Sequence, residues 1–374
     1  MRIAQLANFH SPTSGGLRVA ADTLRAGYLA AGHDCTLIVP GTIDAARDGV
    51  RTLRSPRLGD TGYRVIVRRA AVLALLDELR PDVLEVHDKL LQGWVWRWSR
   101  LRGVPVVAWS HERLGRTLPL LLPVVPETLL RQASARIARH TAGTCDLLIA
   151  CSRFAADEFP PYAPVRIVRL GVDLDAFRPP AQRQRSSKLR LVLTARLSPE
   201  KRPELAVDAL RELHERGVAA ELTVLGSGPR QARLAGYAHG LPVRFTGHLR
   251  SRDRVAAELG AADVALATAP AETFGLAALE ALACGTPIVA HGGAAPAELV
   301  AQHAGAGEVA AGDAAAFAAA ALRLAAIPRK TRQDSARGAA EAYPWSATTA
   351  AMLAVHAEVT SAPLPQPRAY AVDA

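Results

Sequence analysis

The sequence predicts an α/β protein built from two Rossmann-like, doubly wound domains. Its 374 residues suffice for two domains of ordinary size. Short apolar runs alternate with amphipathic helical patterns along most of the chain, which is typical of βαβ units and a parallel sheet. The pattern breaks at a polar stretch rich in proline and arginine and then starts again. We therefore expect an N-terminal domain over 1–177, a linker over 178–188 and a C-terminal domain over 189–344.

Six apolar runs predict the strands of the N-terminal domain, and helical patterns separate them. The expected strands are 2–8, 35–40, 83–87, 104–110, 146–151 and 165–170. The expected helices are 17–31, 64–79, 90–102, 127–142 and 152–158.

The C-terminal domain repeats this alternation. Its expected strands are 189–196, 220–226, 243–247, 263–268 and 287–292. Its expected helices are 203–216, 229–238, 251–261, 275–284, 295–301 and 313–326. A last helix over 345–359 is expected to pack back toward the N-terminal domain, and the proline-rich tail 360–374 is expected to be disordered.

The charge and composition narrow the class of protein. The chain carries a net charge of +10, and 49% of its residues are hydrophobic. A basic surface attracts nucleic acid, anionic lipid or a phosphorylated substrate, and charge alone does not choose among them. No nucleic-acid-binding motif accompanies the charge, so we expect no nucleic-acid partner.

The cysteines and apolar runs predict a protein with reduced thiols that is either soluble or peripheral to a membrane. Cys35, Cys145, Cys151 and Cys284 form no CxxC pair, which argues against structural zinc and a disulfide framework. The start of the chain looks like a strand rather than a signal peptide, and no run approaches the roughly 18 apolar residues of a spanning helix. We expect a cytoplasmic location, at most peripheral on the inner face of the cell membrane.

Two loops at predicted strand ends suit an anionic ligand. After the first strand, Gly15 and Gly16 precede an amphipathic helix, so backbone N–H groups can approach an anion there. A flexible turn is the alternative, because the loop matches no established phosphate motif. After the first strand of the second half, ARLSPEKRP carries Arg196 and Lys201. A guanidinium fork and a point charge suit a diphosphate, and the alternative is a solvated charge run.

Two carboxylates bracket a predicted helix start in AETFGLAALE, residues 271–280. Glu272 lies in the loop, and Glu280 lies about five residues into the helix, roughly 7 Å further along its axis. This separation argues against the pair about 5 Å apart of a retaining hydrolase, although distance alone does not exclude an inverting pair. The N–H groups between the acids can hold phosphate. The arrangement therefore suits a nucleotide sugar, with one acid on the sugar and the other on the ribose.

These motifs together resemble the retaining glycosyltransferase family 4, of GT-B fold. The resemblance covers about residues 1–357 and rests on E-x7-E within FGLAALEALACGTP, on RLSPEKRP, on the glycine-rich first loop and on GVDLDAF. Further matches in ANFHSPTSGGLR, GYLAAGHD, LRPDVLEVHDKL and SHERL make the chain most similar to actinobacterial GDP-mannose-dependent phosphatidylinositol (di)mannoside α-mannosyltransferases. The resemblance implies two Rossmann-like domains facing a central cleft.

The resemblance also implies roles for matching positions. Arg196 and Lys201 would neutralise the donor diphosphate, Glu272 would orient the donor sugar, and Glu280 would hold the ribose. His111, in SHERL, would face the sugar near the reacting carbon, rather than being only a packed or surface histidine. The four catalytic residues so implied are Arg196, Lys201, His111 and Glu272. The further donor-binding residues so implied are Gly15, Gly16, Gly226, Gly247, Leu249, Phe274, Gly275, Leu276 and Glu280.

The implied chemistry is mannose transfer from GDP-mannose by front-face return, because no residue is an obvious covalent nucleophile. The two cations would do the work of a metal, and no DxD-like metal site is present. We therefore expect no required cofactor, although Mg²⁺ could stimulate turnover. Two departures from the family pattern concern the donor sugar: the loop AHGGAAPAEL replaces a serine-rich loop, and Arg202 stands where Gly or His is usual.

The acceptor is expected on the N-terminal domain and is implied to be a phosphatidylinositol mannoside glycolipid, with an α-1,6 linkage. The candidate acceptor-binding residues are His87, Asp88, Lys89 and Arg113. The segment WVWRWSR, 94–100, suits either a membrane interface or core packing, and we favour core packing. The arginines of the helix near 127–142 suggest an anionic membrane surface as a partner.

Two other interpretations stay open. One is a retaining glycosyltransferase that uses another UDP- or GDP-sugar on a soluble or secondary-metabolite acceptor. The other is a nucleotide-sugar-binding protein without turnover, which the intact set of Arg196, Lys201, Glu272, Glu280 and His111 disfavours.

Overall fold

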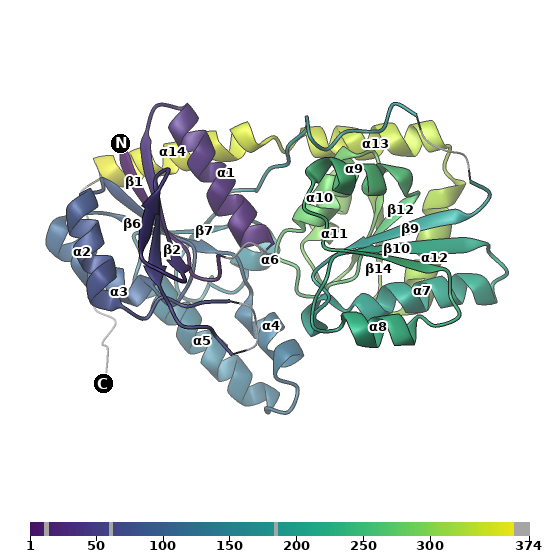
Figure 1. The fold of residues 1–374 in the computed structure, drawn as a ribbon, viewed down its shortest axis with the longest axis horizontal. Coiled ribbons are helices and arrows are strands. Elements are labelled where there is room, and N and C mark those ends of the chain that lie inside the picture. The colour runs from purple at the N-terminus through teal and green to yellow at the C-terminus, as the bar shows by residue number, and fades with distance from the viewer. Residues whose placement is uncertain (11–14, 60–62, 183–185, 363–374) are drawn as a thin grey trace. The chain divides into compact units, whose positions relative to one another are not determined.

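The structure is a computed structural model that describes residues 1–10, 15–59, 63–182 and 186–362. It divides into two compact α/β units, drawn in Figure 1. The first unit comprises the described parts of Met1–Gly115, Val125–Leu170 and Trp345–Ala374. The second unit comprises Arg116–Val124 and the described parts of Gly171–Pro344.

The first unit is built on an eight-stranded sheet of order β3-β4-β2-β1-β5-β6-β7-β8. All neighbours are parallel except β3 and β4, which form an antiparallel hairpin at one edge. The strands are β1 (Arg2–Leu6), β2 (Asp34–Gly41), β3 (Ala45–Arg47), β4 (Val50–Arg54), β5 (Val83–Val86), β6 (Val106–Ser110), β7 (Leu147–Ala150) and β8 (Val165–Ile167). The strand order reverses between β1 and β5: earlier strands are added on one side of β1 and later strands on the other. In open α/β sheets, ligands bind at such a reversal of strand order.

Helices cover both faces of the first sheet. α1 (Gly16–Ala30) and α14 (Trp345–Ser361) lie side by side over one face (Figure 1). The other face packs against α2 (Arg69–Leu79), α3 (Gln92–Arg102) and α5 (Glu127–Gly143). The remaining helices around this unit are α4 (Leu114–Leu121) and α6 (Arg153–Ala156). The alternation of β5 places Leu84 and Val86 in the core under α2 and α3, so Glu85 points to the opposite face.

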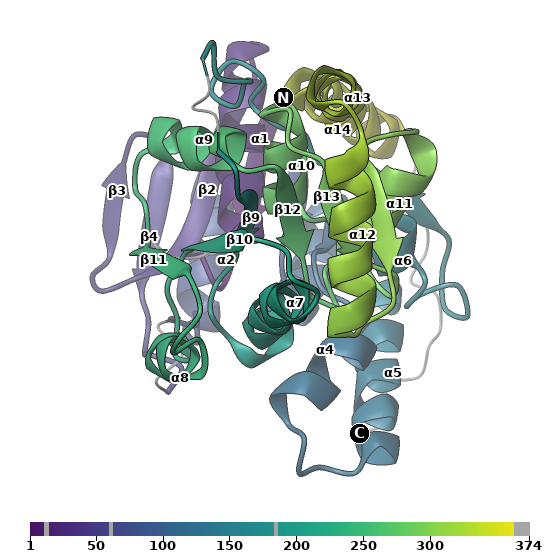
Figure 2. The same ribbon diagram turned by 90° about the vertical axis from the view of Figure 1, so that its right-hand side faces the viewer.

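The second unit is built on a six-stranded parallel sheet of order β11-β10-β9-β12-β13-β14. The strands are β9 (Leu189–Thr194), β10 (Ala220–Leu225), β11 (Val243–Gly247), β12 (Val264–Ala267), β13 (Ile288–His291) and β14 (Gly307–Ala310). Its helical elements are η1 (Pro199–Lys201), α7 (Pro203–Glu215), α8 (Gln231–Tyr237), α9 (Arg252–Ala261), α10 (Leu276–Ala283), α11 (Pro296–Gln302), α12 (Ala314–Ala326) and α13 (Arg329–Glu341). α7 and α12 lie side by side on one face (Figure 2). In this sheet the strand order reverses between the neighbouring strands β9 and β12.

The predicted parallel sheets are confirmed, and all eleven expected strands lie within two or three residues of observed ones. The hairpin of β3 and β4 was not predicted, because an exposed edge pair such as AAR and VRTLR has no apolar run. β14, α4 and α13 were also missed. α13 buries mainly small residues, Ala336, Ala339 and Ala340, so its sequence shows no apolar stripe. α2 begins at Arg69 rather than at 64, because the preceding segment is extended and Ile66 donates its N–H to Asn8.

The domain boundaries of the sequence analysis stay a prediction. In the observed division, the main part of the second unit is Gly171–Pro344, and Arg116–Val124 also belongs to it. α14 returns to the first unit and packs on α1, with Thr349 against Gly27; a Cβ on Gly27 would lie 2.4 Å from the Thr349 hydroxyl. The expected disorder of the tail falls on 363–374, outside the described residues, whereas Thr360 and Ser361 are helical.

The loop after β10 depends on a glycine, and this dependence can be tested. Gly226 has φ +127°, and a Cβ there would lie 2.0 Å from the Ala195 carbonyl oxygen. We expect Gly226→Ala to destabilise the protein by at least about 2 kcal/mol, from the clash and the strained backbone together. Gly240, with φ +80° and nothing within 4 Å of a Cβ, is the matched control. Gly240→Ala should cost only about 1 kcal/mol. Urea unfolding measures both, and equal losses would show that the close approach is unimportant.

Candidate active site

The loops at the carboxyl ends of the second sheet carry most of the predicted donor residues. Arg196 and Lys201 follow β9, Glu272 follows β12, and these two strands are neighbours at the reversal of strand order. Thr268, directly after β12, donates its hydroxyl to the Lys201 carbonyl at 2.8 Å. This bond fixes the η1 turn against the end of β12. The structure therefore brings together side chains that the sequence placed on separate loops.

Lys201 and Glu272 form an ion pair. The Lys201 Nζ lies 2.7 Å from Glu272 Oε2, and the side chains are 29% and 26% exposed. Burial pushes the pKa of Glu272 up, but the Lys201 charge and hydrogen bonds from Lys201 and from the N–H groups of Phe274 and Gly275 outweigh it, so the pKa is lowered. Glu272 is therefore an anion beside a cation, and both remain within reach of solvent.

The N–H groups of Phe274 and Gly275 were predicted to orient the donor sugar together with Glu272. In this structure both donate to the Glu272 carboxylate. The same donors therefore hold the carboxylate in place. Gly275, with φ +90°, precedes α10, and a Cβ there would lie 2.6 Å from Pro296 Cγ, so the turn requires glycine. Leu276 begins α10 and belongs to the first turn, where N–H groups lack helical partners.

Glu280 has a different environment from Glu272. It lies half-buried on α10. Burial raises its pKa to about 7, and the positive charge of Arg252 opposes this only in part. No lysine or arginine forms an ion pair with it among the described contacts. Its side chain is therefore close to half-protonated near neutral pH.

Glycine loops and Arg196 complete the second unit's part of the site. Arg196 is half-buried directly after β9. The N–H of Gly226 donates to the carbonyl of Gly247 at 2.9 Å, which joins the loops after β10 and β11. Leu249 is half-buried two residues beyond β11. Arg202 occupies a left-handed conformation, with φ +45°, between η1 and α7, which explains why glycine suits this position.

His111 lies in the first unit, directly after β6. Its Nε2 lies 2.9 Å from Nδ1 of His87, which follows β5. Burial lowers the pKa of His111 to about 3, with a further contribution from the neighbouring His87. His111 is therefore neutral at physiological pH. Gly15, also in the first unit, precedes α1 without a side-chain cap, and Gly16 is the first residue of that helix.

The four predicted acceptor residues differ in accessibility. His87 is 1% exposed and Asp88 is 6% exposed. The Asp88 carboxylate accepts hydrogen bonds of at most 3.0 Å from the N–H groups of Asn8, Leu90 and Leu91. It therefore links the residues that follow β1 to those that precede α3. Both residues are enclosed by their own unit.

Lys89 and Arg113 lie nearer the surface. Lys89 pairs with Glu158 at 2.6 Å, with 11% of its side chain exposed. Arg113 lies 3.6 Å from Asp157 and over the ring of Phe154, with 21% exposed. Acceptor binding by the four residues stays a prediction, and these two are the more accessible.

The tryptophan-rich helix α3 packs in the core. Trp98 is 7% exposed and donates its ring N–H to Asp77 at 3.0 Å, while Trp94 packs on the same core. This arrangement confirms core packing rather than a membrane interface for WVWRWSR.

The sequence analysis missed two residues around His87. The first is Glu85, which is fully buried and lies 2.8 Å from His87. The second is His356 of α14, 3.1 Å from Glu85. A carboxylate within the apolar strand sequence VLEV was the available signal for Glu85. Nothing in the sequence connected it to His356.

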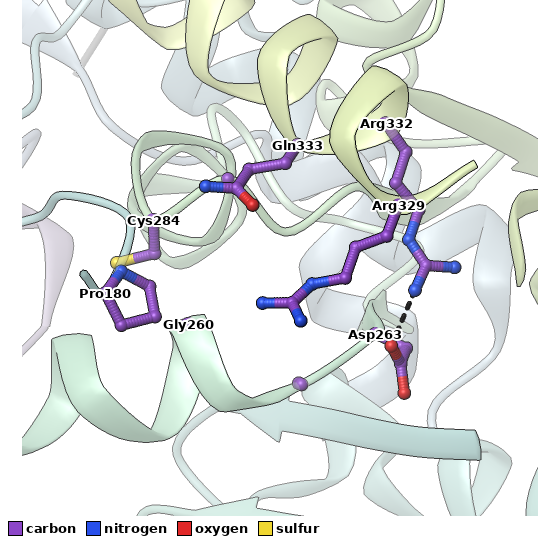
Figure 3. A pocket seen from close by; sticks show the side chains of 9 residues that line it. Pro180, Gly260, Asp263, Cys284, Arg329, Arg332 and Gln333 are labelled. Atoms are coloured by element: carbon purple, nitrogen blue, oxygen red, sulfur yellow. Dashed lines mark hydrogen bonds and ion pairs between the residues drawn. The ribbon is translucent and has the colours of Figure 1, made fainter. Parts of the chain in front are cut away.

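Figure 3 shows a small hollow in the second unit, lined by residues that include Asp263 and Arg332. Arg332 of α13 reaches Asp263, directly before β12, at 2.6 Å and also donates to two carbonyls of α12. The hollow, lined also by Cys284 and Arg329, has a volume of about 10 Å³, room for roughly one water molecule. The hollow therefore lies near the amino ends of β12 and β13, at the opposite end of these strands from the loops of the candidate site.

The described residues contain no group of three or more His, Cys, Asp or Glu side chains placed to hold a metal ion. Within the same part of the chain, none of the helices has the length and apolar character to cross a bilayer.

Two protein families match the chain, one in each half. The family described as "Glycosyltransferase Family 4" matches residues 14–176, and "Glycosyl transferases group 1" matches 188–326. A GDP-mannose-dependent alpha-(1-6)-phosphatidylinositol dimannoside mannosyltransferase of Mycobacterium tuberculosis is 41% identical over 95% of both chains. A GDP-mannose-dependent alpha-mannosyltransferase of Mycolicibacterium smegmatis is 30% identical over 80% of this chain and 82% of the other.

The fold agrees with this assignment. The solved sucrose-phosphate synthase of Thermosynechococcus elongatus superposes with a TM-score of 0.78 at 20% identity, over 96% of this chain and 99% of the other. The two parallel-sheet units are therefore those of the GT-B fold. With cations and carboxylates gathered at the strand ends of its second unit, this chain is a glycosyltransferase and belongs to glycosyltransferase family 4.

Proposed function

We propose that the enzyme transfers mannose from GDP-mannose to a phosphatidylinositol mannoside glycolipid, forming an α-1,6 linkage with retention at the sugar carbon. The observation that carries this proposal is the 41% identity over 95% of the chain to a protein of that donor and acceptor. The Lys201–Glu272 pair supports it, since a sugar and a diphosphate need an anion and a cation side by side.

The donor half of the mechanism uses the second unit. Lys201 and Arg196 bind the diphosphate and stabilise the charge that grows on it as the sugar leaves. Glu272, held by the N–H groups of Phe274 and Gly275, accepts hydrogen bonds from sugar hydroxyls. Glu280 accepts hydrogen bonds from the ribose hydroxyls, and its ionised form is the stronger acceptor.

The transfer step proceeds on one face of the sugar. The bond between the sugar carbon and the leaving phosphate oxygen breaks, and the acceptor hydroxyl oxygen bonds to that carbon from the same side. The acceptor proton passes to the leaving phosphate oxygen. Two cations supply the charge stabilisation, so we propose that turnover needs no metal, with Mg²⁺ at most stimulatory; EDTA treatment that abolishes turnover would refute this.

The alternative is another UDP- or GDP-sugar on a soluble acceptor. It is favoured by the loop after β13, where AHGGAAPAEL replaces a serine-rich sequence and the N–H of Gly293 bonds to the His291 ring at 3.0 Å. A donor screen with GDP-mannose, UDP-glucose and UDP-N-acetylglucosamine decides between them. Consumption of a UDP-sugar without binding of GDP-mannose would overturn the first proposal.

Lys201→Ala tests the phosphate role. With the donor that the screen identifies, we expect turnover at saturating donor to fall about 10²- to 10³-fold, because a preorganised positive charge at the leaving group is lost. Lys188→Ala is the matched control, since Lys188 is half-exposed before β9 and outside the site. Initial rates measure both variants. Unchanged turnover in Lys201→Ala would remove this residue from the mechanism.

Glu280→Gln tests the ribose role through pH. A carboxyl whose pKa is raised to about 7 on folding destabilises the fold above that pH, and the penalty disappears as pH falls toward the unfolded value. Glu280→Gln should therefore stabilise the protein at pH 8, by at most about 3 kcal/mol, and much less at pH 5. Thermal unfolding at both pH values measures this.

The same variant should bind donor about tenfold more weakly at pH 8, because a neutral amide is a poorer acceptor. In the unchanged enzyme, donor affinity should fall as pH drops below about 7, since protonation removes the anion. Donor titrations across pH test this, and an affinity that is identical in the two proteins at pH 8 would contradict the assignment.

We further propose that α5 lies on an anionic membrane surface at the cytoplasmic side. Its exposed face carries Leu129 and Ile137 together with Arg131, Arg136 and Arg139. Flotation with vesicles of anionic lipid at low salt should carry the protein upward, and a variant with the three arginines changed to Glu should stay behind. The absence of flotation of the unchanged protein at low salt would refute the proposal.

A further inference from the structure

The loop after β13 supports the turn that carries Glu272. Ala295 donates its N–H to the Glu272 carbonyl at 2.9 Å. One residue further on, the Pro296 ring packs against Gly275, since a Cβ on that glycine would lie 2.6 Å from Pro296 Cγ. The loop thus touches both ends of the turn from Glu272 to Gly275. These two contacts fix where the turn lies relative to the end of β13.

The backbone donors of this loop are engaged within the second unit. Each N–H group from Gly292 to Glu298 has a protein acceptor, apart from Pro296, which has no N–H. The acceptors are, in chain order, the Ala310 carbonyl, Nδ1 of His291, the His291 carbonyl, the Glu272 carbonyl, the Ala294 carbonyl and the Ala295 carbonyl. A ligand could take one of these donors only by breaking an existing hydrogen bond. The N–H groups of the loop therefore support the site rather than contact the ligand.

His291, the last residue of β13, accepts one of these bonds through its side chain. Gly293 donates its N–H to Nδ1 of the ring at 3.0 Å. A donating backbone N–H requires an Nδ1 without a proton, so the neutral ring carries its proton on Nε2. Burial lowers the pKa of His291, and the positive charge of Arg202 lowers it further. The ring is therefore neutral near pH 7, with the Nδ1 lone pair directed at the loop.

Gly312, two residues after β14, bounds the other edge of the ring. A Cβ on Gly312 would lie 2.5 Å from Nε2 of His291, and a Cβ on Gly293 would lie 3.4 Å from Nδ1. The imidazole thus fits between two glycines. Arg202 donates to the Gly312 carbonyl at 3.3 Å. The two departures from the family pattern, Arg202 and the loop after β13, therefore lie in one assembly around His291.

We propose that His291 is a positioning residue for the donor sugar: it fixes the loop after β13, and the loop fixes Glu272. Its effect on the sugar rests on the proposed function, in which Glu272 binds the donor sugar. When the ring no longer accepts a hydrogen bond from the loop, the contact of Ala295 with Glu272 loosens, and the carboxylate meets the sugar in a wider range of positions. The diphosphate contact changes little, because the Lys201 carbonyl keeps its separate bond with Thr268.

Two ligands separate this role from a merely structural one, because GDP-mannose carries the sugar and GDP lacks it. His291→Phe keeps a ring but removes the acceptor. We expect its affinity for GDP-mannose to fall about fivefold, the usual contribution of one neutral hydrogen bond. Its affinity for GDP should stay within about twofold, since no sugar contact is involved. Calorimetric titration of the full chain with each ligand measures both affinities.

His291→Asn is the conservative rescue. In an Asx turn, an asparagine oxygen accepts the N–H two residues further along, so this variant should bind both ligands as the unchanged protein does. Gly312→Ala tests the same ring from its other side, because the added methyl displaces Nε2 and should reproduce the selective loss. His239→Phe, at an exposed position after α8, is the control and should change neither affinity.

The outcomes separate this inference from the proposed function. A folded His291→Phe that binds both ligands as the unchanged protein does refutes the inference, and so does an equal loss of affinity for both. If His291→Phe does not fold, Gly312→Ala decides, and normal binding of GDP-mannose by that variant overturns the inference. If the donor screen selects a UDP-sugar, the proposed donor is wrong, and the affinities for that sugar and for UDP test His291 in the same way.

Discussion

The ion pair of Lys201 and Glu272, 2.7 Å apart, is the central interaction of the proposed donor site. It joins the loop after β9 to the loop after β12, on either side of the reversal in strand order. The hydroxyl of Thr268 ties the same two loops together through the backbone. Each charge lowers the cost of holding the other partly away from water. Without the lysine, Glu272 would be an uncompensated anion at the place where we propose that the donor diphosphate binds. The other residues of the second unit that we propose to bind the donor follow strands of the same sheet or lie at the start of α10 and within it.

Three carboxylates in this fold show how the environment assigns their chemistry. Glu272 has a cation and backbone donors, so its pKa is lowered and it stays ionised. Glu85 is fully enclosed, yet the surrounding donors also hold its pKa down. Glu280 has neither a paired cation nor several donors, so burial dominates and its pKa rises to about 7. Two acids eight positions apart in the sequence thus differ in charge at neutral pH. This difference suits the roles proposed above, in which Glu272 is an anion throughout and Glu280 gains hydrogen-bond partners only when the donor binds.

The sequence predicted the fold and the donor residues for different physical reasons. The strands could be predicted because buried parallel strands are short, continuous apolar runs, and β3, β4 and β14 were missed because they lack such runs. Lys201 and Glu272 could be assigned to one site because each follows a strand at the same sheet edge. Their direct contact, across 71 positions, depends on packing that no spacing reveals. The polar contacts of Glu85 could not be predicted for the same reason, since they come from Tyr28, Trp109 and His356 on three elements far apart in the sequence. The burial of His87 and Asp88 likewise emerged only from the packed structure.

The state of His111 bears on where the acceptor proton goes. A base with a pKa of about 3 is too weak to remove a proton from a hydroxyl at neutral pH. Its Nε2 lies 2.9 Å from Nδ1 of the buried His87, so this nitrogen is already engaged within the first unit. In the second unit, Glu272 is ionised but engaged by Lys201 and two N–H groups. The groups that the family resemblance places around the sugar are therefore built to hold it rather than to take protons. This leaves the departing phosphate as the strongest base at the reacting carbon, which is the requirement of the same-face transfer proposed above.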